Sequence, residues 1–329
     1  MMTQSLSTPP SAFRLVVMGT GPFAVPMFRA VYDAGFTVAA LVTQPLRPPV
    51  GKKPAPVPPM RPVAEEHGTP IFDPPSINTD EAREVLRGCK PDLFLVADYG
   101  QILKPETLDV ARLGGINLHG SLLPKYRGAA PINWAIYNGD AETGVTVIQM
   151  SSRVDAGAAL AKASLLVDPD ENAVDLERRL SELGAPLVCD VIARLAAGNI
   201  EPMPQDPSLA TPARRLRKTD GEIDWRRSAL QIKNQIRAFE PWPRSATNWL
   251  RDGVEPLRLI VARIEAISGE KSAEPGVVVA VDKESFSLAA GEGIAIVREV
   301  QAAGKRQMSA GEFLRGYPVK VGDRFGSIG

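Results

Sequence analysis

Cysteine and histidine are scarce in this chain of 329 residues. The two cysteines, Cys89 and Cys189, stand alone, without the short spacing that zinc sites and redox pairs require. His67 and His119 are the only histidines, which excludes a histidine-rich metal centre, and we expect no metal. The sequence also lacks a signal peptide pattern and any run of roughly 20 apolar residues. We therefore expect a cytoplasmic protein that does not contact membranes.

An excess of one charge is missing as well. Lysine and arginine together number 38, as do aspartate and glutamate, so any affinity for nucleic acid must come from a local basic patch. The chain has 44% hydrophobic and 23% charged residues, which is typical of soluble globular proteins. Its length predicts two domains, because one compact domain usually spans roughly 100–200 residues.

The first half of the sequence alternates apolar strands with helical segments. Strands are predicted at residues 13–18, 37–42, 70–72, 92–97 and 115–120, an order typical of a Rossmann-like, mostly parallel α/β sheet. Two further apolar segments, ending near residue 167, predict antiparallel strands. In the second half, short strands separated by glycine and charged turns predict a small OB-like β-barrel.

Proline and polar residues are concentrated between residues 201 and 219, a composition typical of a crossing between domains. We therefore divide the chain into a disordered tail (1–11), an α/β catalytic domain (12–206), a linker (207–222) and a C-terminal β-barrel domain (223–329).

The turn Gly19-Thr20-Gly21 follows the first predicted strand, as in dinucleotide-binding proteins. The third glycine of that fingerprint is absent, and no acidic residue ends the second strand, where Val42-Thr43-Gln44 stands. A nicotinamide enzyme is therefore disfavoured, and a tight turn that leads into a helix explains these glycines better.

A group of polar residues lies near the middle of the chain. Asn117 and His119 are two apart on a predicted strand, so they project to the same face, at the carboxyl end where open α/β sheets bind ligands. An amide and an imidazole can both donate hydrogen bonds to the oxyanion of an acyl-transfer intermediate. Asp155, in a loop after the next strand, could orient His119 or relay a proton. Taken alone, Asn117 and His119 could equally be structural polar residues, and Asp155 a turn residue.

The surrounding segment resembles the folate-dependent formyltransferase family. The family signature, Asn-x-His-x-Ser-Leu-Leu-Pro, then Arg-Gly and later Asp-x-Gly, is matched by Asn117, His119, Ser121–Pro124, Arg127–Gly128 and Asp155–Gly157. The resemblance implies a Rossmann-like fold, 10-formyltetrahydrofolate as co-substrate, and Asn117, His119 and Asp155 as catalytic residues. It also implies a folate pocket along Tyr99, Gly100, Gln101, Ile102, Leu103, Ser121, Leu122, Leu123 and Pro124.

Within that family, the resemblance extends over nearly the whole chain to the members that formylate the α-amine of initiator methionyl-tRNA for protein synthesis. It includes residues 237–243 (RAFEPWP) and 303–316 (AGKRQMSAGEFLRG) near the C-terminus. The positive charge that binds tRNA phosphates would come from two basic clusters, one in the proline-rich loop at 45–62 and one at the domain crossing. We predict tRNA contacts at Arg47, Lys52, Lys53, Arg214 and Arg215. We expect a monomer, and the alternative is an amino-sugar nucleotide N-formyltransferase with the same donor.

The chain departs from the family pattern at two positions. Val50 stands where the family usually has an arginine before Gly-Lys-Lys, which bears on how the end of the tRNA is opened. Asp98 stands where a small apolar residue is usual, and it places an additional carboxylate beside the expected folate pocket.

Overall fold

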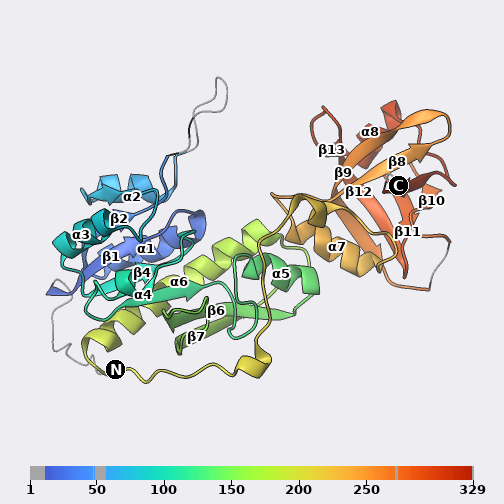
Figure 1. Cartoon of the computed structure of the whole chain (residues 1–329). Coiled ribbons are helices and arrows are strands. Elements are labelled where there is room, and N and C mark those ends of the chain that lie inside the picture. The colour runs from blue at the N-terminus through green and yellow to red at the C-terminus, as the bar shows by residue number, and fades with distance from the viewer. Residues whose placement is uncertain (1–11, 47, 49–56, 271–272, 328–329) are drawn as a thin grey trace. The chain divides into compact units, whose positions relative to one another are not determined.

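The computed structural model describes residues 12–46, 48, 57–270 and 273–327. Contacts between residues divide the chain into two compact units, coloured by residue number in Figure 1. Unit 1 comprises Met1–Pro131, Glu142–Leu166 and Glu177–Arg214, and unit 2 comprises Ile132–Ala141, Val167–Leu176 and Arg215–Gly329. The predicted tail, residues 1–11, lies outside the described residues.

Unit 1 is built on a seven-stranded sheet with the order β3-β2-β1-β4-β5-β6-β7. Five strands run parallel, and β6 and β7 are antiparallel to their neighbours. The strands are β1 (Arg14–Met18), β2 (Thr37–Val42), β3 (Ile71–Phe72), β4 (Leu93–Val96), β5 (Gly115–His119), β6 (Glu142–Gln149) and β7 (Ala159–Leu166). The predicted Rossmann-like sheet is thus confirmed, including its antiparallel extension.

The strand order reverses between β1 and β4, since β2 continues from one side of β1 and β5 from the far side of β4. Ligands of open α/β sheets bind at the carboxyl ends of strands near such a reversal. The helical elements of this part of the chain are η2 (Pro22–Ala24), α1 (Val25–Asp33), α2 (Met60–Glu66), α3 (Asp80–Cys89), α4 (Pro105–Leu108), η3 (Pro207–Leu209) and α6 (Ala173–Ala196), which begins in unit 2.

Helix α2 begins inside the stretch that the sequence suggested was a proline-rich loop. Pro62 is its third residue and lies in the first turn. Backbone N–H groups of the first turn have no partner within the helix, so the missing N–H of proline costs no helical hydrogen bond. The proline content therefore predicted a loop where helix α2 in fact begins. Helix α3 follows sequence rules more closely, since the hydroxyl of Thr79 caps it by accepting from the backbone N–H of Ala82.

Unit 2 contains a second, antiparallel sheet with the order β10-β11-β12-β9-β8-β14, and β13 pairs with β12. An isolated bridge between Val277 and Arg324 joins the two edges of this sheet, which closes it into a barrel. This confirms the small barrel that was predicted. Its strands are β8 (Ala246–Arg251), β9 (Val254–Ile267), β10 (Val278–Val281), β11 (Phe286–Ala289), β12 (Ile294–Ala302), β13 (Met308–Ser309) and β14 (Arg324–Gly326). The helical elements are α5 (Pro131–Asn138), η4 (Lys218–Gly221), α7 (Ala229–Ala238) and α8 (Ala310–Gly316).

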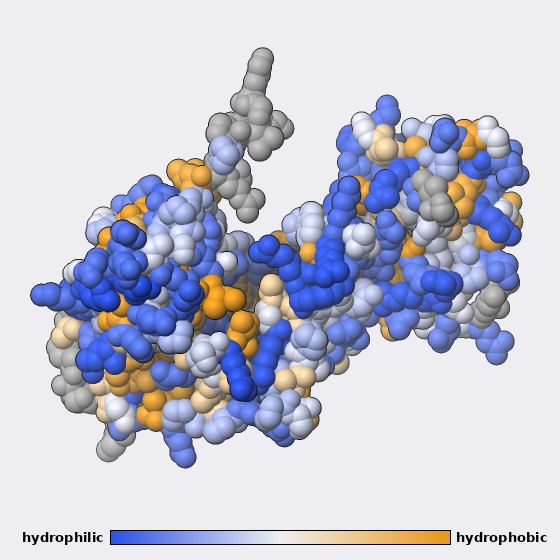
Figure 2. Space-filling model, in the orientation of Figure 1, coloured by the Kyte–Doolittle hydropathy of each residue, from blue (hydrophilic) through white to orange (hydrophobic). Residues whose placement is uncertain are grey.

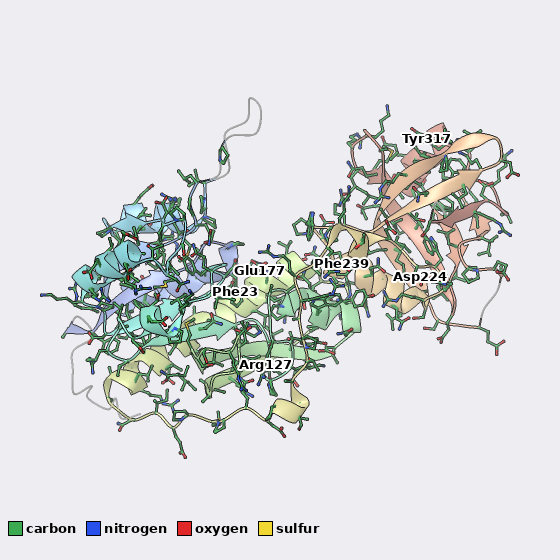
Figure 3. The ribbon with its side chains drawn as sticks, in the orientation of Figure 1. Phe23, Arg127, Glu177, Asp224, Phe239 and Tyr317 are labelled. Carbon is green, nitrogen blue, oxygen red and sulfur yellow. The ribbon has the colours of Figure 1, made fainter. Side chains whose placement is uncertain are left out.

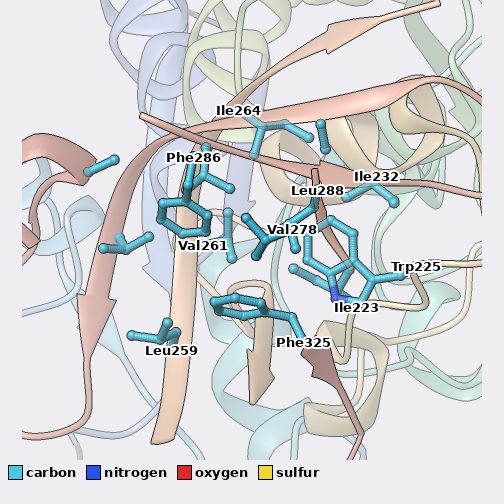
Figure 4. Packing of buried hydrophobic residues seen from close by; sticks show 14 of the residues in the cluster. Ile223, Trp225, Ile232, Leu259, Val261, Ile264, Val278, Phe286, Leu288 and Phe325 are labelled. Carbon is cyan, nitrogen blue, oxygen red and sulfur yellow. The ribbon is translucent and has the colours of Figure 1, made fainter. Parts of the chain in front are cut away.

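The core of unit 2 fills the inside of this barrel (Figure 4). Phe286, Phe313 and Trp225 are at most 3% exposed, and the Phe286 ring stacks on that of Phe325 at 5.5 Å. Hydrophilic side chains cover most of the visible face of each unit (Figure 2). Within the part of the chain that the structure describes, no helix has the length and apolarity to cross a bilayer.

Candidate active site

Asn117 and His119 lie at the carboxyl end of β5, between parallel β4 and antiparallel β6. Asn117 is half-buried, and His119 is only 5% exposed. Two residues apart on one strand, their side chains project from the same face of the sheet. Both therefore occupy the edge where the fold binds ligands.

Asp155 joins them from the loop between β6 and β7. Its Oδ1 is 3.5 Å from Nδ2 of Asn117, which donates to it, and its Oδ2 is 3.6 Å from Nδ1 of His119. The backbone N–H of Gly128 donates to Oδ2 at 2.9 Å. The φ angle of Asp155 is 50°, in the left-handed region, a conformation that persists only where surrounding contacts hold it. The structure thus brings the three predicted residues together around one carboxylate.

The contacts of His119 fix its tautomer. Nε2 lies 2.8 Å from the carbonyl oxygen of Tyr126, and a carbonyl can only accept, so Nε2 carries a proton. In the neutral ring, Nδ1 is then an acceptor that faces the carboxylate of Asp155. Nδ1 is therefore the nitrogen that can gain a proton, and gaining it would pair a cation with Asp155.

Gln205 is a residue of the site that sequence reasoning missed. Its Nε2 donates to the carbonyl oxygens of Asp155 at 2.9 Å and Gly157 at 2.7 Å. Its Oε1 accepts from Nε and Nη2 of Arg127 at 3.1 and 2.7 Å, and Figure 3 shows where Arg127 lies. Gln205 thus ties the Asp155 loop to the Arg127 loop. Glutamine in a proline-rich stretch gives no sequence signal for this, since the contact is long-range.

A second strap follows six residues later. The hydroxyl of Thr211 accepts from the N–H of Tyr126 at 2.9 Å, and the N–H of Ala213 donates to the carbonyl of Arg127 at 2.6 Å. Gly128 has φ 124°, and a Cβ there would lie 2.5 Å from the carbonyl oxygen of Ala213, so only glycine fits. Residues that sequence reasoning placed in a linker therefore hold the loop that donates to Asp155.

A cavity of about 160 Å³ opens beside Asn117 and Asp155. The predicted segment Tyr99–Leu103 lines it. The Tyr99 hydroxyl is buried without a hydrogen-bond partner, and burial raises the pKa of Tyr99. The other lining residues are Val96, Ile148, Met150, Ser151, Arg153 and Val154.

The predicted folate residues Ser121–Pro124 are not part of this lining. They form a braced turn: the Ser121 hydroxyl donates to the carbonyl of Lys125 at 2.6 Å, and the N–H of Leu123 donates to the hydroxyl of Thr146 at 3.0 Å. Lys162 Nζ donates to the Leu123 carbonyl. Contact of Ser121, Leu122, Leu123 and Pro124 with folate stays a prediction.

Asp98 lies at the reversal of strand order, and it is not among the residues that line the cavity. As a residue it is exposed, yet a Cβ on Gly21 would lie 1.7 Å from its Oδ2, so protein encloses the carboxyl closely. Loss of solvent raises the pKa of Asp98 to about 6. Burial, and then the nearby charge of Asp98, raise the pKa of Glu177 to about 7. Gly19–Gly21 forms the expected tight turn before η2 and α1.

The predicted tRNA-contacting residues fall partly outside the structure. Arg47, Lys52 and Lys53, and also Val50, lie outside the described residues. Arg214 and Arg215 are exposed, the last residue of unit 1's final segment and the first of unit 2's. Within the described ranges, no group of three or more His, Cys, Asp or Glu residues could hold a metal ion.

The fold and the polar site together define a group-transfer enzyme of the acyl-transfer type. Residues 13–192 match the family model described as formyl transferase, and residues 215–318 match that of the formyl transferase C-terminal domain. The chain is 42% identical over 316 residues to the methionyl-tRNA formyltransferase of Citrifermentans bemidjiense, covering 96% of this chain and 97% of that protein. It is 40% identical to the enzyme of that name from Halalkalibacterium halodurans, covering 92% and 94%.

Two solved structures share the fold at low identity. The N-formyltransferase of Helicobacter canadensis, in complex with folinic acid and dTDP-3-aminofucose, has a TM-score of 0.65 at 18% identity, covering 88% of this chain and 99% of that one. HypX from Aquifex aeolicus in complex with tetrahydrofolic acid has a TM-score of 0.61 at 16% identity, covering 96% and 51%. The chain belongs to the formyl transferase family, and within it to the methionyl-tRNA formyltransferases. The family resemblance seen in the sequence is confirmed.

Proposed function

We propose that this protein transfers the formyl group of 10-formyltetrahydrofolate to the free α-amine of initiator methionyl-tRNA, for the initiation of protein synthesis. The observation that carries the proposal is the meeting of Asn117, His119 and Asp155, in a chain about 40% identical to methionyl-tRNA formyltransferases. Asn117 and Asp155 also line a cavity. The expected cytoplasmic location and monomeric state remain predictions.

The three polar residues have complementary roles in this mechanism. The neutral amine attacks the formyl carbon, and the Nδ2–H of Asn117 stabilises the oxyanion that develops. Nδ1 of His119, paired with Asp155, accepts the proton that the amine loses as the new C–N bond forms. The bond between the formyl carbon and the carrier nitrogen then breaks, and that nitrogen takes a proton. The hydrogen bond between Asn117 and Asp155 holds the amide donor and the carboxylate in fixed positions relative to each other.

The cavity suits the head group of the folate. Pockets for whole drug-sized ligands span roughly 300–1,000 Å³. A volume of about 160 Å³ therefore fits one ring system, with the rest of the carrier outside.

The acceptor is tested by competition. The purified protein, given 10-formyltetrahydrofolate, should formylate methionyl-tRNA with a far higher kcat/KM than an amino-sugar nucleotide. A double variant, Lys52→Ala with Lys53→Ala, should have a higher KM for tRNA and an unchanged affinity for folate. The slope of log tRNA affinity against log salt concentration should fall by up to about one or two units. Preference for the sugar nucleotide would reject the tRNA proposal and support the alternative.

A further inference from the structure

The four tryptophans of the chain are not equivalent. Trp225 and Trp249 are both 3% exposed, and their indole N–H groups donate to Thr247 at 3.0 Å and to Asp323 at 3.1 Å. Trp134 packs edge-on against Phe239, with ring centroids 6.1 Å apart. These three side chains pack against other residues of unit 2.

Trp242 differs from these three in its exposure and in its contacts. It is 53% exposed, and among the described residues neither its ring nor its N–H has a stacking or hydrogen-bond partner. Pro241 and Pro243 flank it, and each proline fixes its own φ angle, so the loop that presents the indole has few conformations to lose on binding. Trp242 is therefore a preorganised flat surface that faces solvent.

The turn that packs against the Trp242 loop carries two exposed cations. A Cβ on Gly221 would lie 2.1 Å from the carbonyl oxygen of Arg244 and 3.4 Å from Cγ of Pro243, so the turn η4 packs against the Trp242 loop. Arg217 and Lys218, at the start of that turn, are exposed. The acidic side chain nearest in sequence, Glu240, pairs with Arg244 at 3.3 Å.

An exposed apolar side chain alone would need no explanation, since single exposed hydrophobic residues are common. Val254, for example, is also 53% exposed. What distinguishes Trp242 is an exposed aromatic ring, an indole N–H without a partner among the described residues, two flanking prolines, and packing of its loop against a turn that carries two exposed cations. Proteins that bind unpaired nucleotides combine stacking aromatics with positive charge in this way.

We propose that Trp242 is a stacking platform for an unpaired base of the acceptor tRNA, with Arg217 and Lys218 against the adjacent phosphates. This inference rests on the proposed function. Stacking on an aromatic side chain strengthens binding of a base by roughly 5- to 100-fold. The interaction is independent of base identity in its main part, because every base has a π-face.

The test uses the full-length protein with Trp242→Ala, Trp242→Phe and Val254→Ala as a control of equal exposure. Trp242→Ala should weaken methionyl-tRNA binding roughly 5- to 100-fold and raise KM, with kcat at saturating tRNA and folate affinity unchanged. Trp242→Phe should retain most of the affinity, since it keeps a stacking ring. Val254→Ala should bind as the unaltered protein does.

Salt titration separates stacking from charge. Trp242→Ala should leave the slope of log affinity against log salt unchanged, whereas Lys218→Ala should reduce it by about one unit. The intrinsic fluorescence of the protein, corrected for absorption by tRNA, should fall on addition of tRNA, and the fall should be smaller in Trp242→Phe.

The outcomes distinguish the inference from the function on which it rests. If the unaltered protein formylates methionyl-tRNA and Trp242→Ala does so with the same KM, only the stacking inference is overturned. If the unaltered protein does not formylate methionyl-tRNA, the proposed function fails first. A fluorescence change of equal size in Trp242→Phe, corrected for absorption by tRNA, would also reject the inference.

Discussion

The two units hold their functional residues in opposite ways. In unit 1, Asn117, His119 and Asp155 are at least half-buried and joined by contacts through one carboxylate. In unit 2, Trp242 and Lys218 stand exposed on a closed barrel whose apolar core does not involve them. The difference teaches that unit 1 should fail steeply when a single atom is changed, whereas unit 2 should lose affinity in graded steps.

The largest effect is expected at the His119–Asp155 pair. General acid–base groups contribute roughly 10²–10⁴-fold, so His119→Ala or Asp155→Ala should each lower kcat by that order. The double variant should cost little more than the worse single one, because groups that act together show non-additive losses. Measured kcat/KM losses that simply multiply would mean independent roles, and would break the picture of one coupled site in unit 1.

Asn117→Asp should come next, with a loss of roughly 10²–10³ in kcat. The change removes the Nδ2–H donor and sets a second carboxylate 3.5 Å from Oδ1 of Asp155. Circular dichroism should be unaltered, because aspartate has nearly the shape of asparagine, and the affinity for methionyl-tRNA should be unaltered, because Asn117 is not among the predicted tRNA-contacting residues. A variant that keeps most of its activity would show that Asn117 does not face the oxyanion.

Gln205 should produce a smaller effect, because it acts through the position of Asp155. Gln205→Glu keeps acceptors for Arg127 but loses both donors to the Asp155 loop, and we expect about a tenfold loss of kcat with KM for tRNA unchanged. Asp206→Asn is the matched control, since that side chain accepts only from Ser208. A changed pH profile of kcat in Gln205→Glu would support positioning. If Gln205→Glu and Asp206→Asn lowered kcat equally, Gln205 would have no specific role in positioning Asp155.

The smallest effect is on stability, and it depends on pH. The pKa of Glu177 is raised to about 7 in the folded protein, so between about pH 4.5 and 7 the folded state holds a proton that the unfolded chain has released. Stability contributed by this group therefore falls as pH rises through that window, and the full penalty remains above it. Glu177→Gln should raise the Tm by a few degrees at pH 8 and little at pH 5. A Tm gain independent of pH would contradict this cause.

The sequence predicted the central strands of unit 1 well, because β1, β2 and β4 are short apolar runs followed by glycine or a polar turn. Residues 37–42, for example, coincide with β2. The predicted strand at residues 115–120 covers β5, which carries Asn117 and His119. Local patterns sufficed there, since burial on both faces of a parallel strand leaves a continuous hydrophobic signature.

The sequence could not predict features that depend on long-range contacts. Gln205, Thr211 and Ala213 carry no local signal, yet they hold the Asp155 and Arg127 loops from more than forty residues away. The side-chain position of Asp98 also required the structure, since it lies against Gly21 and is not among the residues that line the cavity. The predicted domain boundary near residue 206 stays a prediction, while the contacts of unit 1 continue to Arg214.

The chain passes from one unit to the other after Pro131, Ala141, Leu166, Leu176 and Arg214. A protease that cuts one of these crossings would split the chain into two pieces, and the non-covalent contacts within the units would hold these pieces together. During synthesis, every segment of unit 1 emerges from the ribosome before residue 215, whereas residues 132–141 and 167–176 must wait for the rest of unit 2. The catalytic sheet can thus form first, and the barrel completes last, around helices made long before its strands.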